Sequence, residues 1–361
     1  MERIGKYELA AMIILFEVGS SSLFQLGAKA NRDAWISMLL AFAAGLLLLG
    51  MFLYINGQEG RRNFADTLRR HFGRWLGTLV AAAYSLYFAY ESMRNVRDFG
   101  DLMATTFLTN TPISFIMLVL ILLSGYAVYK GVEVFFRTVG ILLPLVGFSY
   151  ILLIVLFFAS DVLRTDRILP VLEDGIAPVL KAVPSIVMFP FGQMVVFLIF
   201  WQFAQDKSFV PKVSICAYLV TGTILTILNV CNIMILGAPL AGISSLPLLH
   251  AVRMMTIGAF MGRIDAFVVM LLFLALFVKA TLWYLSSVVV LGQLAKRTDH
   301  RAFVAPAGVL IYFASFLEPN YIYHIWIGIE VSTLRIFPWF QIALPAALLL
   351  IIAVKKRRSK R

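Results

Sequence analysis

The chain has 361 residues, of which 61% are hydrophobic and 14% are charged, and its formal net charge is +12. A soluble fold of this length does not hide so large an apolar fraction, and the charged residues gather between long apolar runs, so the composition indicates one integral membrane domain. The basic excess lies in short connectors and in segment 355–361, where membrane topology and anionic lipid headgroups account for it, so we expect lipid and not nucleic acid as a partner.

Ten apolar segments, each near the length of about 20 residues that crosses the hydrocarbon core, predict an all-α protein with about ten transmembrane helices. We expect the first five to form one repeat over about 7–159, the last five to form a second over about 184–354, and a short basic tail to follow at 355–361. The segments are 7–28, 34–55, 76–100, 112–129, 138–159, 184–204, 213–236, 265–292, 302–318 and 338–354.

The distribution of lysine and arginine predicts the orientation. With both termini cytoplasmic, that side carries 20 of the 31 lysines and arginines and the opposite side carries 8, as expected for an even number of spans. The first segment ends in Ala28-Lys29-Ala30, a small-x-small pattern typical of signal cleavage. We expect no cleavage, because the apolar run is too long for a signal core and contains Glu17.

The first and sixth segments each contain a stretch where a membrane helix is expected to unwind, at 17–22 and at 190–193. Such breaks persist only where protein or a hydrated cavity satisfies the freed backbone groups. Close packing of small residues, or a simple proline kink, is the alternative for either stretch alone. Their matching positions favour a five-plus-five inverted repeat that binds a ligand at mid-membrane. The expected ligand-binding residues of the two breaks are Gly19, Ser20, Ser21, Phe191, Gly192 and Gln193.

The ends of two half-helices indicate the chemistry of the ligand. A half-helix N-terminus favours a carboxylate and a C-terminus favours an ammonium group, so a zwitterionic amino acid suits both. Phe189 and Phe191 can form the wall for its side chain, although aromatic residues in a membrane span also serve plain packing.

Two ionisable residues lie deep in predicted spans. Lys279 is near the middle of the eighth segment, where insertion scales put its cost at about 2.5–3.5 kcal/mol. We expect Glu17 to be its partner, because the first and eighth helices of an inverted-repeat transporter are neighbours beside the ligand. The pair forms either a coupling site, with the ammonium in place of a sodium ion, or an ion pair that only joins two helices.

The third segment carries a further carboxylate, Glu91, which can line the cavity together with Tyr87 and Tyr90 or instead pair with Arg94. The charged residues that follow have the i,i+4 spacing of ion pairs, and we expect them at the outer interface. The two expected pairs are Arg94/Asp98 and Arg97/Asp101.

Cofactor and enzyme chemistry are not expected. The two cysteines lie on one predicted helix about 22 Å apart, too far to bridge, and the four histidines are scattered through connectors without metal-ligand spacing. We find no nucleophile-base pair or phosphate loop on one side of a site, which disfavours a membrane-embedded enzyme.

Three stretches resemble a known family. The first is Asp33-Ala34-Trp35-Ile36-Ser37 and the second runs from Val96 to Leu102. The third precedes the eighth span, and its matching residues are Pro247, Arg253, Gly258, Phe260, Arg263, Asp265 and Ala266. By its pattern alone the third stretch is an amphipathic surface segment in which Asp265 caps the next helix. Together they resemble the spore germination permease family, the B subunits of nutrient germinant receptors within the amino-acid/polyamine/organocation superfamily.

The resemblance implies a LeuT-like fold and a nutrient, commonly an amino acid, that is sensed from outside. It also implies a complex with an A subunit and a C lipoprotein in the spore inner membrane. Gly19, Ser20, Gly192 and the middle of span eight correspond to site positions. Family members often have an acidic residue after the span-six glycine where this chain has Gln193, which leaves the ligand class open. The alternative function is an autonomous amino-acid transporter, sodium-independent or proton-coupled.

Overall fold

The structure is a computed structural model that describes residues 2–60, 62–255, 264–297, 299–318 and 320–359. The described part is built from helices, with shorter 3-10 and π-helical elements labelled η. The first half comprises α1 (Lys6–Val18), η1 (Ser20–Leu23), η2 (Ala28–Asp33), α2 (Ala34–Glu59), α3 (Phe64–Phe72), α4 (Arg74–Thr106), α5 (Ile113–Lys130) and α6 (Val132–Ala159).

The second half begins with short elements around the sixth span and ends in a long helix. It comprises η3 (Thr165–Ile168), α7 (Ile176–Met188), η4 (Phe191–Val196), α8 (Phe197–Phe200), η5 (Trp201–Phe203), η6 (Lys207–Phe209), α9 (Val210–Leu236), α10 (Ala238–Ile243), α11 (Pro247–Arg253), α12 (Ile264–Leu294), η7 (Arg301–Phe303), α13 (Val304–Ala314), α14 (Tyr321–Trp326), η8 (Ile327–Ile336), η9 (Trp339–Ala343) and α15 (Leu344–Ser359).

The expected all-helical membrane architecture is confirmed. Seven helical stretches of the described chain are long and apolar enough to cross a membrane. They are 28–59, 113–130, 132–159, 176–203, 207–236, 265–294 and 321–357. The other three predicted spans coincide with α1 and η1, with the long but charged α4, and with the shorter apolar helix that contains α13.

One predicted boundary is wrong, and one connector contains a helix that was not predicted. The last span was expected at 338–354, but the helical stretch begins at Tyr321 and extends for 37 residues. The connector at 61–74 contains an amphipathic helix, α3, whose N-cap Asn63 accepts a hydrogen bond from the Asp66 amide at 2.8 Å. In both places polar and basic side chains lower the local hydropathy, although the backbone remains helical.

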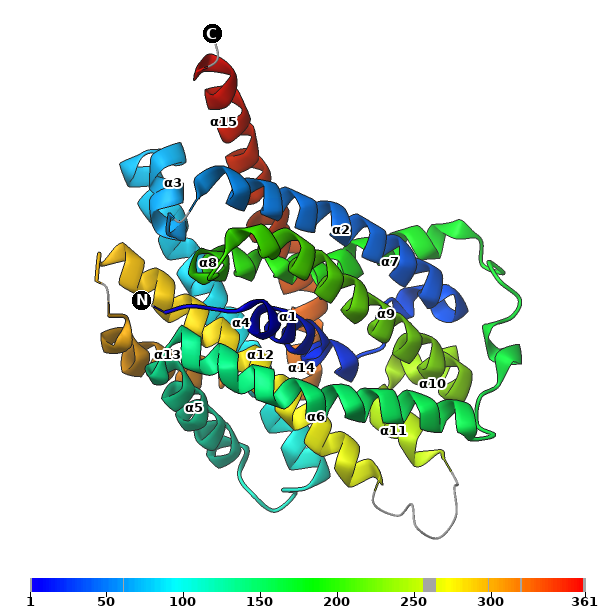
Figure 1. Cartoon of the computed structure of the whole chain (residues 1–361). Coiled ribbons are helices and arrows are strands. Elements are labelled where there is room, and N and C mark those ends of the chain that lie inside the picture. Colours follow the sequence, from blue (N-terminus) through cyan, green and yellow to red (C-terminus); the bar gives the residue numbers. More distant parts are fainter. Residues whose placement is uncertain (1, 61, 256–263, 298, 319, 360–361) are drawn as a thin grey trace.

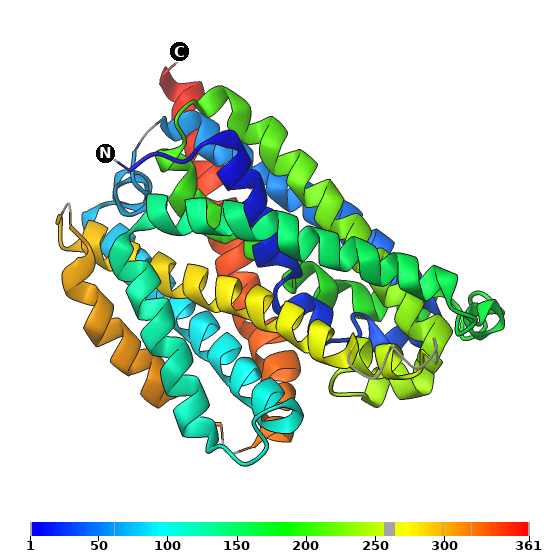
Figure 2. The same cartoon turned by 60° about the horizontal axis from the view of Figure 1, so that its bottom comes forward.

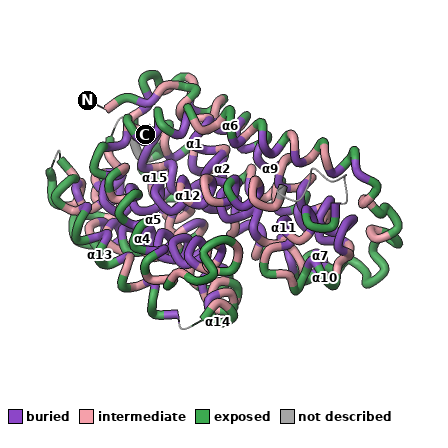
Figure 3. Tube along the Cα trace, turned by 90° about the horizontal axis from the view of Figure 1, so that it is seen from below, coloured by how far each residue is buried: buried purple, intermediate pink, exposed green. Residues whose placement is uncertain are grey.

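Helix α1 lies in the middle of the bundle, packed against α6, α9 and α12 (Figure 1). Between Leu9 and Phe16 its side chains are apolar on every face, and Leu9, Met12 and Phe16 are fully buried, as expected for the central part of a helix that is surrounded by other helices. In contrast, α6 exposes one face that includes Ile141 and Phe148. Figure 3 shows the same contrast, with buried chain concentrated in the interior and exposed chain at the periphery and in the connections.

Both expected helix breaks are present. Helix α1 ends at Val18, and Gly19 has the non-helical backbone angles φ −9° and ψ −110° before the 3-10 turn η1. Helix α7 ends at Met188, and Phe189 is extended before the turn η4. The two breaks approach each other, since α1 packs against η4 while η1 packs against α9 and α12. The chain therefore opens at both positions predicted from the sequence, and the two openings are neighbours in the bundle.

The two termini lie on the same side of the bundle, at the upper left of Figure 2. The N-terminal segment is tied to neighbouring connectors, since the Glu2 carboxylate accepts from the Val132 amide and the Ile4 amide donates to Phe203. Lys355, near the C-terminus, donates to the Arg70 carbonyl at 2.9 Å. Phe203 lies at the end of the predicted sixth span, and the other contacts lie in connectors that the charge distribution assigns to one side of the membrane.

Candidate functional site

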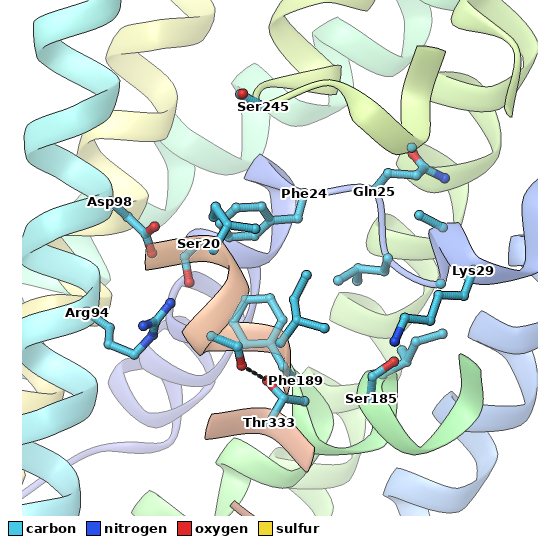
Figure 4. Close-up of a pocket in the computed structure, with 18 of the residues that line it drawn as sticks. Ser20, Phe24, Gln25, Lys29, Arg94, Asp98, Ser185, Phe189, Ser245 and Thr333 are labelled. Atoms are coloured by element: carbon cyan, nitrogen blue, oxygen red, sulfur yellow. Dashed lines mark hydrogen bonds between the residues drawn. The ribbon is translucent and has the colours of Figure 1, made fainter. Parts of the chain in front are cut away.

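A cavity of about 370 Å³ lies beside the two breaks. Its walls come from segment 20–29 after the first break, from α4, from the end of α7, from segment 242–245, and from the last long helix between 321 and 337. In Figure 4, Arg94 and Asp98 project from α4 on one side, and the rings of Phe24 and Phe189 lie across the middle. The lining is largely apolar with a few polar groups, which is typical of a site for a small molecule.

The first break supplies one residue of the cavity wall, Ser20. Gly19 allows the close approach of α12, because a side chain there would meet the Lys279 Cδ atom at 2.6 Å and the Phe16 carbonyl oxygen at 2.8 Å. Ser21 is buried and accepts a hydrogen bond from Lys279 Nζ at 3.4 Å. Gly19 and Ser21 thus contact Lys279 of α12 and do not line this cavity.

Phe189 at the second break lines the cavity, whereas the three residues expected to bind ligand there, Phe191, Gly192 and Gln193, are buried and do not line it. Phe191 stacks on Phe42 with ring centroids 5.6 Å apart. Gly192 lies against Gln341, and a side chain at Gly192 would overlap the Gln341 Oε1 atom. Gln193 donates from Nε2 to Glu91 Oε2 at 3.0 Å. This contact joins the second break to α4, the helix that forms one wall of the cavity.

Glu91 lines the cavity, as expected, and is 2% exposed. Its Oε2 atom is engaged by Gln193, while Oε1 has no hydrogen-bond partner. The expected alternative partner, Arg94, is engaged elsewhere. Tyr87, one turn earlier, does not line the cavity. Its hydroxyl accepts a hydrogen bond from the buried Gln341 Nε2 at 2.8 Å.

The expected ion pair between Glu17 and Lys279 is not formed. Both side chains are fully buried, but Lys279 Nζ points to Ser21 and lies 4.7 Å from the ring centroid of Phe189 and 5.3 Å from that of Phe16. Neither carboxylate oxygen of Glu17 has a hydrogen-bond partner. The reason is the absence of a side chain at Gly19, which lets the aliphatic part of Lys279 pack against the first break. The ammonium group then lies beside two aromatic rings, which stabilise a cation through cation–π interactions.

A cluster of buried charges that the sequence did not predict lies beside the cavity. His324 Nε2 is 2.9 Å from Asp98 Oδ1, and His324 Nδ1 contacts Glu318. Arg94 donates to Glu318 Oε1 at 2.8 Å and to the His324 carbonyl at 2.9 Å. The expected Arg94/Asp98 pair is therefore wrong, whereas the Arg97/Asp101 pair is present at 2.8 Å. We call Arg94, Asp98, Glu318 and His324 the α4–α14 charge cluster.

Sequence reasoning missed this cluster for two reasons. Glu318 was expected only as the end of the ninth span and His324 as part of a connector, and their partners on α4 are more than 200 residues away. The sequence did contain one signal, an acidic residue and a histidine six residues apart (Glu318 and His324), in a protein whose third predicted span already carries several charges. No group of three or more His, Cys, Asp or Glu side chains in the described ranges could hold a metal ion.

The stretch before the eighth span is partly described. Pro247 opens α11, whose Leu248 and Val252 are buried, while Arg253 is half exposed and lies 3.8 Å from Asp265. Asp265 Oδ1 accepts from the amide of the next residue at 2.8 Å, near the start of α12. The burial pattern of α11 fits the amphipathic segment expected there, whereas Asp265 lies within the first turn of α12 and makes no N-cap contact with a later amide. Three of the matching residues, Gly258, Phe260 and Arg263, lie outside the described residues.

Sequence comparison identifies relatives over nearly the whole chain. A family profile described as spore germination protein matches residues 3–322. Spore germination protein KB of Bacillus subtilis (strain 168) is 32% identical over 99% of this chain and 97% of its own length. Spore germination protein YndE of the same organism is 24% identical over 91% of this chain and 90% of its own.

Comparison with solved structures identifies the fold. MhsT in complex with L-phenylalanine superposes with a TM-score of 0.64 at 16% identity, covering 97% of this chain and 88% of MhsT. Mhp1, a nucleobase-cation-symport-1 family transporter with bromovinylhydantoin bound, also gives a TM-score of 0.64, at 12% identity, covering 92% of this chain and 76% of Mhp1. The arrangement is therefore that of the LeuT-fold transporters.

Proposed function

Because the chain belongs to the spore germination permease family, as the B-type, non-enzymatic subunit of a germinant receptor, we propose that it senses a small nutrient at mid-membrane and triggers germination. The proposed ligand is an amino acid, bound between the breaks of the first and sixth spanning helices. Its recognition rests on the cavity-lining Ser20 and Glu91. The proposed supporting residues are Gly19, Ser21, Tyr87, Phe191, Gly192 and Gln193.

The observation that carries this proposal is the cavity beside the paired breaks. Its volume, about 370 Å³, is near the lower end of the range of small-ligand sites, about 300–1,000 Å³. Apolar walls from Phe24, Phe189 and Phe337 enclose it, and Ser20 and Glu91 supply polar groups. A small molecule with one apolar and one polar part is complementary to such a lining.

The assembly and location follow from family membership and from charge. The chain is an integral membrane protein of a receptor complex. We further propose that its partners are an A subunit and a C lipoprotein in the spore inner membrane, with both termini cytoplasmic. The excess of lysine and arginine on the side of the termini supports this orientation. A reporter fused after Arg361 that is active only in the cytoplasm tests it, and activity of an exported reporter would contradict it.

An autonomous transporter is the second candidate, and one observation favours it. Lys279 places an ammonium group beside the first break, 3.4 Å from Ser21. In this position the lysine can replace a coupling cation, so transport would be independent of sodium. The orphan carboxylate of Glu17 is the candidate proton carrier of this mechanism.

Two experiments separate these functions. Deleting the gene should block germination with one class of nutrient, and unchanged germination with every nutrient tested would refute the receptor proposal. The purified chain should bind its ligand without carrying it into liposomes, whereas uptake by the chain alone would favour the transporter. Gly192→Trp should abolish binding, because the added side chain overlaps Gln341 and displaces the second break. Gly50→Trp, at a position with nothing within 4 Å of an added side chain, is the matched control.

A further inference from the structure

Two residues that line the cavity carry buried hydrogen-bond acceptors without a donor. Glu91 and Asn95 both line it, and they are 2% and 3% exposed. The Glu91 Oε1 atom and the Asn95 Oδ1 atom are buried without a hydrogen-bond partner. Because they are one helical turn apart on α4, they can contact the same group.

The orientation of both acceptors is determined by their other contacts. Asn95 Nδ2 donates to the Glu91 carbonyl at 2.8 Å, so a flipped amide would place two oxygens against each other. Gln193 Nε2 donates to Glu91 Oε2 and leaves Oε1 free. An amide at position 193 thus aligns the carboxylate, whereas an acidic residue there would repel it.

Neither of the two nearby cations donates a hydrogen bond to these acceptors. Arg94 is held by Glu318 and by the His324 carbonyl. Lys279 donates to Ser21 and lies over aromatic rings. A buried carboxylate oxygen without a donor is costly, so the site is complementary to a cationic donor that arrives from the cavity.

We propose that Glu91 Oε1 and Asn95 Oδ1 form a subsite for the protonated primary amine of the ligand. This inference rests on the proposed function and deepens it. It makes the ligand's amine the main group that the site recognises, and the ligand's carboxylate contributes less to binding. The remainder of the ligand lies against Phe24, Phe189 and Phe337. Gln193 is a positioning residue, since it contacts the ligand only through Glu91.

The test is a binding screen of the purified full chain with sets of three probes. Each set contains an amino acid, the analogue that lacks its carboxylate and the analogue that lacks its amine. The sets are L-alanine, ethylamine and propionate; L-valine, isobutylamine and isovalerate; and L-phenylalanine, 2-phenylethylamine and 3-phenylpropionate. For any amino acid that binds, we expect the amine analogue to retain binding and the acid analogue to bind at least about 10-fold more weakly, as for loss of a charge-assisted hydrogen bond.

Variants locate the effect. Glu91→Gln should weaken binding of the amino acid and of its amine analogue by about 10-fold or more, and it should leave binding of the acid analogue unchanged. Glu173→Gln removes an exposed carboxylate paired with Arg32, and it should not change the affinity for any of the three probes. Should Glu91→Gln fail to fold, Asn95→Leu removes the second acceptor at similar volume, and we expect it to weaken the same two probes by a smaller factor.

The outcomes separate the inference from the proposed function. If an amino acid binds but its acid analogue binds as well as its amine analogue, the inference is overturned and the proposed function stands. The same holds if neither the Glu91 variant nor the Asn95 variant changes the preference for the amine. If none of the three amino acids binds, the proposed amino-acid ligand is wrong, and the amine subsite is rejected with it.

Discussion

Glu318 is the residue through which the α4–α14 charge cluster can be tested. Its carboxylate accepts from Arg94 at 2.8 Å and contacts His324. The side chains of Arg94 and Glu318 are 11% and 5% exposed, and that of His324 is fully buried. The change Glu318→Ala therefore leaves a buried guanidinium without its carboxylate and removes one of the two acids that face His324.

The expected cost follows from this burial. Removing one partner of a buried ion pair costs about 3–5 kcal/mol, because the other charge remains in a low-dielectric environment. The exposed pair Arg32/Glu173 is equally short, at 2.7 Å, with side chains 41% and 55% exposed. Exposed pairs contribute about 0–1 kcal/mol. We therefore expect Glu318→Ala to lower the free energy of unfolding by about 3 kcal/mol more than Glu173→Ala does.

The assay is unfolding of the purified protein by SDS titration in mild detergent micelles, with the free energy of unfolding as the readout. A double variant, Arg94→Met with Glu318→Leu, removes both charges and should recover part of the loss, since buried ion pairs are often replaced by apolar residues at little cost. A Glu318→Ala variant no less stable than Glu173→Ala would refute the reasoning. So would a double variant less stable than Glu318→Ala alone.

Two further predictions concern the breaks. Gly192→Ala should lower the free energy of unfolding by about 1–3 kcal/mol, because the added methyl group overlaps the Gln341 side chain. Gly50→Ala, where the added methyl group meets nothing within 4 Å, should leave thermal stability unchanged or slightly raised. Equal effects of the two substitutions would contradict the packing argument. Glu17 and Lys279 are both fully buried and interact electrostatically although they form no ion pair. A double-mutant cycle of Lys279→Met and Glu17→Gln should therefore give a coupling of about 0.5–3 kcal/mol. Additive losses would show that the two side chains act independently.

Local features of the sequence were sufficient to predict the helices and their breaks. Hydrophobic runs of spanning length identify transmembrane helices because the bilayer imposes both length and polarity. Glycine, serine and proline at 17–22 and 190–193 weaken a helix wherever they occur, and the backbone does leave the helical conformation at Gly19 and Phe189. The sequence placed Glu91 at the cavity because a carboxylate inside a span needs a polar environment.

The partners of these residues were decided only by tertiary structure. Glu91 binds Gln193, 102 residues away, and Arg94 binds Glu318, 224 residues away. Lys279 meets Ser21 instead of Glu17 because the packing of α12 on the first break directs its side chain. Such contacts depend on the rotation and depth of each helix, which are set by the shapes of many side chains together. Hydropathy and charge spacing determine which segments cross the membrane, while the pairing of polar groups inside it emerges only when the helices pack.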